Sequence, residues 1–272
     1  MKKETTIYLW VINEGWKPFC LEESKDELLK RNIFISDSAT IEHSATIGDS
    51  ATIGDSARIG HSATIGDSAT IGDSARIGHS ATIGDYARIG DYATIGDSAT
   101  IGDSARIGHS ARIGHDARIG DSARIGDYAT IGHSATIGHS ARIGHDARIG
   151  DSARIGDYAT IGHSATIGHS ATIGDYARIG DSATIGDSAR IGDKEIINKT
   201  IFITGSRNTI SWWGKNIINI GCEKRTIEEW KKVYKYIGED ENYSESEIEE
   251  YYEYILMIEK MQSKTVIEKV KP

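Results

Sequence analysis

The histidines of this 272-residue chain are the first residues whose type and spacing suggest chemistry. All ten lie between residues 35 and 193, in a slot that recurs every six residues and that holds Asp 17 times and His ten times. Imidazole and carboxylate groups can bind metal ions and transfer protons. A metal site needs three or four ligands that converge on one point, and a row of evenly spaced side chains does not converge. We therefore predict no metal and no cofactor, and we interpret the slot as a solvated turn position.

Arginines form a second regular series. Arg and Thr share one slot of the same six-residue unit, and four arginines follow one another at intervals of 18 residues, namely Arg88, Arg106, Arg124 and Arg142. Guanidinium groups bind phosphates and carboxylates in bidentate fashion. We therefore take this row as a candidate binding site for an anionic group or a carboxylate-rich partner. The alternative is a surface lattice of ion pairs with neighbouring Asp residues.

Short strands joined by tight corners must position these side chains. Isoleucine fills every sixth position from Ile35 to Ile191 without insertion, deletion or proline, and the unit reads Ile-Gly-(Asp/His)-(Ser/Tyr/Asp)-Ala-(Thr/Arg). A period of six excludes a long amphipathic helix, whereas Ala-Thr-Ile alternates as a strand does. Gly, Asp and Ser supply turn residues, with Gly as the conformationally permissive one. Three units close a triangular coil, and about nine coils stack at about 4.8 Å into a prism about 43 Å long, with Ile and Ala inside.

The six-residue unit resembles the hexapeptide repeat of left-handed parallel β-helices, a family that includes acyltransferases of sugar and amino-acid metabolism. The resemblance implies an all-β solenoid. It also implies a trimeric enzyme that uses coenzyme A thioesters, in which a His within a coil removes the proton of the acceptor. Ile113-Gly-His-Asp-Ala-Arg118 and Ile143-Gly-His-Asp-Ala-Arg148 resemble that local pattern. On this reading His115 and His145 are the candidate catalytic bases, with Asp116 and Asp146 beside them.

The flanks of the repeat predict three domains: an N-terminal cap over 1–34, the β-helix over 35–193, and a C-terminal α+β cap over 194–272. Residues 6–13 predict a strand, and Ser24-Lys-Asp-Glu27 is a capping box that predicts a short helix. Thr226-Ile-Glu-Glu229 is a second capping box, and a further helix follows Ser244 or Ser246. Residues 205–208, 221–222 and 226–230 resemble a terminal module appended to other repeat proteins of bacteria and phages.

Charge and cysteine usage bound the compartment and the partners. The formal net charge is −9, and residues 35–193 carry most of it, with 12 Arg against 19 Asp and Glu42. This balance disfavours non-specific binding to nucleic acid or to acidic membranes. The apolar run from Ile7 to Ile12 is too short for a secretory core. Cys20 and Cys222 flank the repeat, so the stacked coils keep them too far apart for a disulfide and we expect free thiols. Free thiols indicate a reducing compartment. We therefore expect a cytoplasmic protein without a membrane partner.

Internal duplication indicates that the length and shape of the solenoid matter more than any single local site. Residues 113–141 recur identically at 143–171, and a shift of 30 residues is five units, which moves each unit to a different face. We therefore favour a non-enzymatic scaffold or spacer that presents its polar surface, or aromatic flanks such as Trp212 and Trp213, to a protein partner. The alternatives are the trimeric acyltransferase and an acidic, rod-like mimic of nucleic acid. Self-association into a homotrimer is compatible with both the scaffold and the acyltransferase.

Overall fold

The computed structural model describes residues 5–11, 13–198, 200–214 and 216–268, with side chains up to residue 262. Ile12, the end of the apolar run, lies outside the described residues. The chain divides into two compact units, Met1–Ile196 and Ile197–Pro272. Among the described residues, no helix has the length and apolar character needed to cross a membrane.

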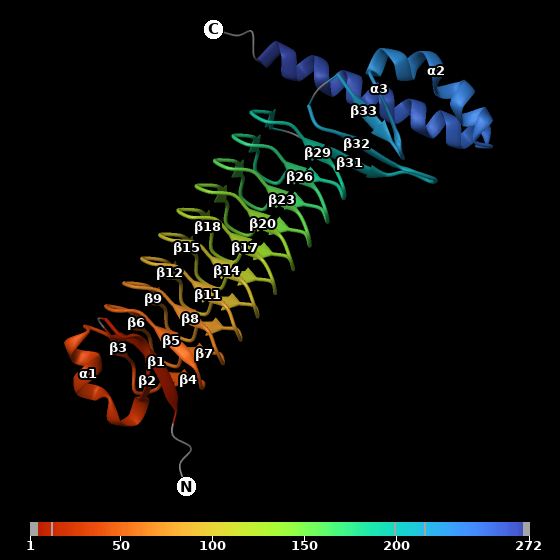
Figure 1. Cartoon of the computed structure of the whole chain (residues 1–272). Helices are drawn as coiled ribbons and strands as arrows, with labels where there is room; N and C mark the ends of the chain where they lie inside the picture. The colour runs from red at the N-terminus through yellow and green to blue at the C-terminus, as the bar shows by residue number, and fades with distance from the viewer. Residues whose placement is uncertain (1–4, 12, 199, 215, 269–272) are drawn as a thin grey trace. The chain divides into compact units, whose positions relative to one another are not determined.

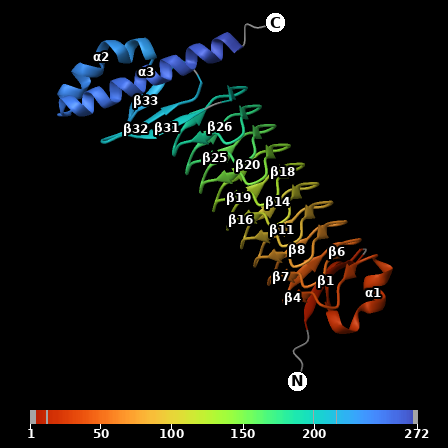
Figure 2. The ribbon, with the colours of Figure 1, turned by 180° about the vertical axis from the view of Figure 1, so that it is seen from behind.

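The first unit is a three-sided β-solenoid, and each side is a sheet of short, mainly parallel strands (Figures 1 and 2). The eleven-stranded face contains, in spatial order, β2 (Gly15–Cys20), β1 (Thr6–Val11), β5 (Ala45–Ile47), β8 (Thr64–Ile65), β11 (Thr82–Ile83), β14 (Thr100–Ile101), β17 (Arg118–Ile119), β20 (Thr136–Ile137), β23 (Arg154–Ile155), β26 (Thr172–Ile173) and β29 (Arg190–Ile191). The nine-stranded face contains β4 (Thr40–Ile41), β7 (Arg58–Ile59), β10 (Arg76–Ile77), β13 (Thr94–Ile95), β16 (Arg112–Ile113), β19 (Thr130–Ile131), β22 (Arg148–Ile149), β25 (Thr166–Ile167) and β28 (Thr184–Ile185). The ten-stranded face contains β3 (Phe34–Ile35), β6 (Thr52–Ile53), β9 (Thr70–Ile71), β12 (Arg88–Ile89), β15 (Arg106–Ile107), β18 (Arg124–Ile125), β21 (Arg142–Ile143), β24 (Thr160–Ile161), β27 (Arg178–Ile179) and β30 (Ile196–Ile197).

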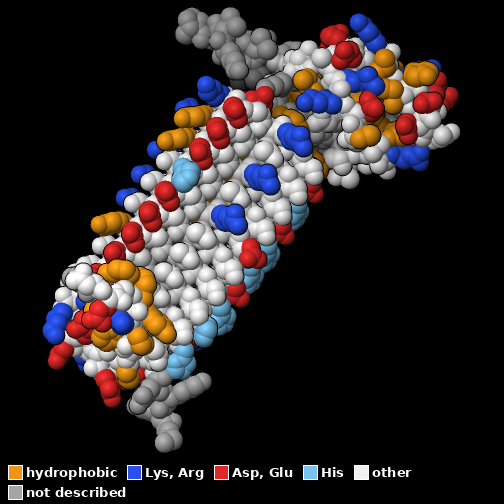
Figure 3. Space-filling model, viewed as in Figure 1, with side chains coloured by type: hydrophobic (Ala, Val, Ile, Leu, Met, Phe, Trp, Pro, Cys, Tyr) orange, Lys and Arg blue, Asp and Glu red, His pale blue; other side chains and the backbone are white. Residues whose placement is uncertain are grey.

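Three corners run along the solenoid, each a column of Asp and His residues 18 apart. The His corner, between the nine- and eleven-stranded faces, runs from His43 to Asp187. The Asp corner, between the eleven- and ten-stranded faces, runs from Asp49 to Asp193. The mixed corner, between the ten- and nine-stranded faces, runs from Asp37 to Asp181. Figure 3 shows one such edge as a row of acidic side chains interrupted by a single His.

The solenoid core is the stack of Ile and Ala that the repeat predicts. Ile65 and Ala99 are fully buried, and nearly every other repeat Ile and Ala from Ile41 to Ile185 is also buried. The intervening Thr or Arg points outward, as strand alternation requires. Parallel register pairs each residue with the one 18 positions later, for example Ile101 with Ile119. The prediction of a left-handed parallel β-helix of about nine coils is confirmed.

The corner chemistry differs from the prediction in one respect. The left-handed backbone conformation falls on the Ser/Tyr/Asp slot, with φ of 57° at Ser68 and 59° at Tyr86, and not on the repeat glycines. Glycine is required because successive coils approach closely at its position. A Cβ placed on Gly102 would collide with Asp121 Oδ1 and would lie 2.6 Å from the Asp121 backbone nitrogen. Close approach, rather than conformational freedom, therefore selects Gly in this slot.

The N-terminal segment extends the eleven-stranded face. Strands β1 and β2 form an antiparallel hairpin, and β1 pairs in parallel with β5. The 3-10 helix η1 (Leu21–Glu23) and helix α1 (Lys25–Lys30) follow. The predicted capping box at Ser24 is wrong, because its hydroxyl donates to the Cys20 carbonyl at 2.6 Å and makes no cap bond to α1.

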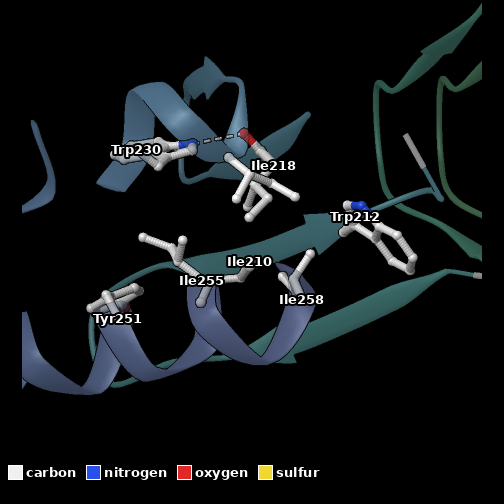
Figure 4. Packing of buried hydrophobic residues seen from close by; sticks show 8 residues of the cluster. Ile210, Trp212, Ile218, Trp230, Tyr251, Ile255 and Ile258 are labelled. Carbon is white, nitrogen blue, oxygen red and sulfur yellow. Dashed lines mark hydrogen bonds between the residues drawn. The ribbon is translucent and has the colours of Figure 1, made fainter. Parts of the chain in front are cut away.

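The second unit is an α+β structure with its own core. Its antiparallel sheet consists of β31 (Ile201–Thr204), β32 (Thr209–Trp212), β33 (Ile218–Ile220) and β34 (Glu223–Arg225), and two helices follow, α2 (Ile227–Asp240) and α3 (Glu245–Glu268). Thr226 and Glu229 form the predicted capping box of α2. Figure 4 shows the buried cluster between sheet and helices, in which Trp230 Nε1 donates to the Ile218 carbonyl at 2.9 Å.

Candidate functional site

The Asp/His slot forms a side-chain ladder along each corner. The backbone N–H of Asp49 donates to Asp67 Oδ1 at 2.8 Å, and that of Asp67 donates to Asp85 Oδ1 at 2.8 Å. His enters the same ladder through its ring, because the N–H of His115 donates to His133 Nδ1 at 3.0 Å. Oδ1 and Nδ1 stand at equivalent positions in the two side chains, so either residue satisfies the N–H one coil earlier. The slot is thus a structural hydrogen-bond acceptor as well as a solvated turn.

His115 and His145 have a setting that combines three features. Each ring faces a carboxylate from the preceding coil: His115 Nδ1 lies 3.6 Å from Asp97 Oδ2, and His145 Nδ1 lies 3.4 Å from Asp127 Oδ2. Each ring also stacks on the imidazole of the following coil, with centroids 5.1 Å apart. Both side chains are about half exposed, at 53% and 51%.

These carboxylates differ from the predicted ones. The sequence pattern placed the following Asp beside each His, whereas the facing carboxylate belongs to the residue 18 positions earlier. Asp116 instead occupies the left-handed corner position, with φ of 57°. The two histidines also stand apart, since His115 belongs to the His corner and His145 to the mixed corner. They form two separate local sites rather than one.

The hydrogen bonds assign the ring tautomer. The N–H of Asp97 donates to His115 Nδ1 at 2.8 Å, and that of Asp127 donates to His145 Nδ1 at 3.0 Å. A neutral ring that accepts at Nδ1 carries its proton on Nε2. When Nδ1 is protonated instead, the ring loses this bond and faces the nearby carboxylate. Among the described residues, no group of three or more His, Cys, Asp or Glu is placed to hold a metal ion.

The four candidate arginines stand in register on the ten-stranded face. Arg88 pairs with Arg106, Arg106 with Arg124, and Arg124 with Arg142. The predicted alternative, a lattice of ion pairs, does not form around them in the part of the chain that the structure describes. There, the arginine ion pairs involve Arg31, Arg207 and Arg225.

The two candidate tryptophans contribute to the C-terminal unit differently from the prediction. Trp212 is 1% exposed and belongs to the buried cluster, so it is not available to a partner. Trp213 is half-buried, and its Nε1 is buried without a hydrogen-bond partner in the described part of the chain. Cys20 and Cys222 are free thiols.

The C-terminal unit holds a small cavity that the sequence does not predict. Its volume is about 200 Å³, and Cys222, Trp230, Tyr234, Tyr243 and Tyr251 help to line it. Burial raises the pKa of Tyr243. Ligand pockets usually begin at about 300 Å³, so this cavity is smaller than a typical cofactor site.

Several solved structures that resemble the chain are acyltransferases. The UDP-N-acetylglucosamine acyltransferase of Campylobacter jejuni is 22% identical, with 88% of this chain and 91% of that chain covered and a TM-score of 0.48. The UDP-N-acetylglucosamine acyltransferase of Arabidopsis is 18% identical, with 74% and 75% covered and a TM-score of 0.43. The acetyltransferase domain of PglB from Neisseria gonorrhoeae FA1090, in complex with acetyl coenzyme A, is 22% identical, with 39% and 54% covered and a TM-score of 0.36. The match thus spans about half the length of the PglB domain.

These matches correct the functional prediction. The duplicated units favoured a non-enzymatic scaffold or spacer, with the acyltransferase as the alternative, whereas these matching structures are acyltransferases. At these identities each likeness is one of fold.

Sequence comparison gives the family. No curated protein matches the chain. The family model described as the GMPPB C-terminal domain matches residues 29–143 and 109–204, which together span more than half of the chain. This range coincides with the coils of the solenoid and the strands that follow them. The chain therefore belongs to the GMPPB C-terminal domain family.

Proposed function

We propose that the chain is an acyltransferase that moves an acyl group from a coenzyme A thioester to an acceptor hydroxyl or amine. The observation that supports this best is the imidazole–carboxylate pair of His115 and Asp97, repeated as His145 and Asp127. Both histidine side chains are about half exposed, so an acceptor can reach the ring from solvent. Such a pair is the usual setting of a general base.

The proposed reaction needs a change of tautomer. With its proton on Nε2, the resting ring cannot act as a base at that atom. When Nδ1 carries the proton and donates it to Asp97 or Asp127, Nε2 becomes free to take the proton of the acceptor. The acceptor oxygen or nitrogen then attacks the thioester carbonyl, the C–S bond breaks, and the imidazolium returns its proton to the thiolate of coenzyme A. Acceptor binding at Nε2 therefore favours the tautomer that the carboxylate stabilises.

We place the substrates at the interface of a homotrimer. The solenoid carries no inserted loop between Ile35 and Ile191 that would cover a ring exposed at a corner. A neighbouring subunit supplies that cover, excludes water from the thioester and strengthens the imidazole–carboxylate interaction. The mass in solution, measured by native mass spectrometry, is expected to be three times the chain mass.

The first test is binding of coenzyme A and acetyl coenzyme A. We expect millimolar concentrations of either compound to raise the melting temperature, and the thioester to be consumed when acceptor sugars or amines are added. A double variant, His115→Asn with His145→Asn, removes both imidazoles but keeps an Oδ1 acceptor for the ladder. We expect it to lose activity and to retain its fold.

The matched control is His109→Asn with His139→Asn. These rings also face carboxylates, with Nδ1 3.6 Å from Asp91 Oδ2 and from Asp121 Oδ2 respectively. Each, however, is followed by Ser, and neither has His in the coil before or after it. We expect the control to keep its activity. No thermal shift with either compound would overturn the proposal, as would equal activity in both double variants.

A further inference from the structure

Five exposed tyrosines occupy a backbone conformation that bulky residues rarely adopt. Their φ values are 58–59° and their exposed fractions 52–66%, and they are Tyr86, Tyr92, Tyr128, Tyr158 and Tyr176. Ser takes the same left-handed conformation at most other corners. A large L-residue in this region is an outlier, because its Cβ comes too close to the following carbonyl oxygen. Because these side chains are exposed, burial in the core does not offset that strain.

All five tyrosines border the ten-stranded face. Tyr86, Tyr158 and Tyr176 follow the Asp corner and therefore precede strands of that face, while Tyr92 and Tyr128 follow such strands at the mixed corner. The His corner, on the opposite side of the prism, carries Ser or Asp in this slot throughout the repeat. Tyr158 and Tyr176 stack with ring centroids 4.9 Å apart. Figure 3 shows hydrophobic and basic side chains together at the margin beyond the acidic row.

The same face carries the row of arginines. Arg88, Arg106, Arg124 and Arg142 lie side by side on consecutive coils, about 4.8 Å apart. Like charges directly opposite one another destabilise a sheet. No carboxylate forms an ion pair with these four in the described part of the chain, as noted above. Repulsion between these arginines therefore destabilises the solenoid, and an anionic ligand bound to them would reduce it.

The acidic corners restrict what kind of anion fits. Asp85, Asp103 and Asp121 border the arginine row on one side, and Asp91 and Asp127 border it on the other. These carboxylates are accessible, with Asp121 56% and Asp91 40% exposed. A polyphosphate or nucleic acid would bring dense charge against both rows. A sugar polymer suits all three features, because its hydroxyls donate to Asp, its carboxylates bind Arg, and its C–H faces pack on Tyr.

We propose that the ten-stranded face, between β12 and β24, binds a linear polysaccharide that carries one carboxylate per sugar and lies along the solenoid axis. The unbroken parallel register gives the arginines a constant spacing, which suits a polymer with a regular repeat. The arginine row, the bordering Asp residues and the tyrosines carry this binding site, and it is independent of whether the chain is an acyltransferase.

Oligomers of galacturonic acid are the probe, and the test is calorimetric titration of the full chain at low salt. A double variant, Arg106→Thr with Arg124→Thr, places the commonest residue of that slot on the face. The matched control, Arg112→Thr with Arg148→Thr, makes the same change on the nine-stranded face. We expect the first pair to weaken binding at least about tenfold, because two charge-assisted hydrogen bonds to the ligand are lost, and the control to change it less than about twofold.

Tyrosine variants and competing ligands provide a second test of the proposal. Tyr92→Ser with Tyr128→Ser restores the usual corner residue and is expected to weaken binding while leaving its dependence on salt unchanged. Neutral dextran is expected not to bind, and oligothymidylate is expected to bind more weakly than oligogalacturonate. Tighter binding of oligothymidylate, equal loss in the two arginine pairs, or no binding of oligogalacturonate at millimolar concentration would each overturn the proposal.

Discussion

The solenoid and the C-terminal unit bury apolar surface in opposite ways. In the solenoid each coil contacts only its neighbours, through rungs such as the Thr100 N–H to the Ala117 carbonyl at 2.9 Å. In the C-terminal unit a single cluster joins distant segments, from Ile210 in β32 to Ile258 in α3. Stability is therefore distributed along the solenoid and concentrated in the other unit. Damage to a coil should remain local, whereas damage to the cluster should unfold the whole C-terminal unit.

The largest effect is expected from Trp230→Ala. The side chain is 3% exposed and donates to the Ile218 carbonyl, so its loss leaves a cavity and an unsatisfied acceptor. Such a change costs about 3–5 kcal/mol, which approaches the whole stability of a small domain. We expect the C-terminal helices to be lost while the solenoid strands persist, measured by circular dichroism during urea unfolding. Simultaneous loss of helix and strand would contradict the comparison.

A medium effect is expected from Gly102→Ala in the middle of the solenoid. The new Cβ would lie 2.6 Å from a backbone nitrogen of the next coil, so two coils must separate locally, at about 1–3 kcal/mol. Gly192→Ala is the matched control, because its Cβ would meet nothing closer than Glu195 Oε1 at 3.4 Å. Hydrogen exchange should show faster exchange only in coils next to residue 102. Faster exchange along the entire solenoid would show that the coils are not independent.

The smallest effect is expected at the helix caps, and it depends on pH. The backbone N–H of Thr226 lowers the pKa of Glu229, and that of Ser244 lowers the pKa of Glu247. A lowered pKa in the folded state adds stability above the usual pKa of Glu, and this stability is lost as the pH falls through the folded value.

The test compares Glu229→Gln with its neighbour Glu228→Gln, which lacks the cap bond. Glu229→Gln should lower the melting temperature of the C-terminal unit at neutral pH and flatten its fall below about pH 4. The control should follow the parent protein over the whole range. An unchanged acid dependence in Glu229→Gln would show that the cap bond is not its source.

The solenoid could be predicted from the sequence because its constraints repeat. One Ile and one Ala in every six residues define the strand, the coil and the core. The reason for Gly102 could not be predicted, because the clash involves a residue 19 positions away whose place depends on the finished fold. The same holds for Asp97 and Asp127, which face His115 and His145 only after the coils have stacked.

The C-terminal unit was predicted less completely. Its helices carry local signals, such as the capping box at Thr226, and the structure has both of them. The burial of Trp212 follows instead from how a four-stranded sheet meets α3, and a tryptophan within an irregular strand pattern does not reveal this. The faces of the solenoid were also hard to tell apart. The duplicated units looked interchangeable, although in the described part of the chain the ten-stranded face unites the arginine row with the exposed tyrosines.

The side-chain ladder also sets the order in which the coils of the solenoid can form during synthesis. Most Asp and His residues of this slot accept from the N–H of the preceding coil, as Asp85 does from Asp67. During synthesis at about 5–20 residues per second, one coil leaves the ribosome in roughly 1–4 s. Each new coil therefore supplies the hydrogen-bond acceptors for the corner N–H groups of the coil before it. Its own corner N–H groups are bonded only when the next coil has formed. The solenoid can therefore fold coil by coil from its N-terminus during synthesis, because each coil needs contacts only with the coils next to it.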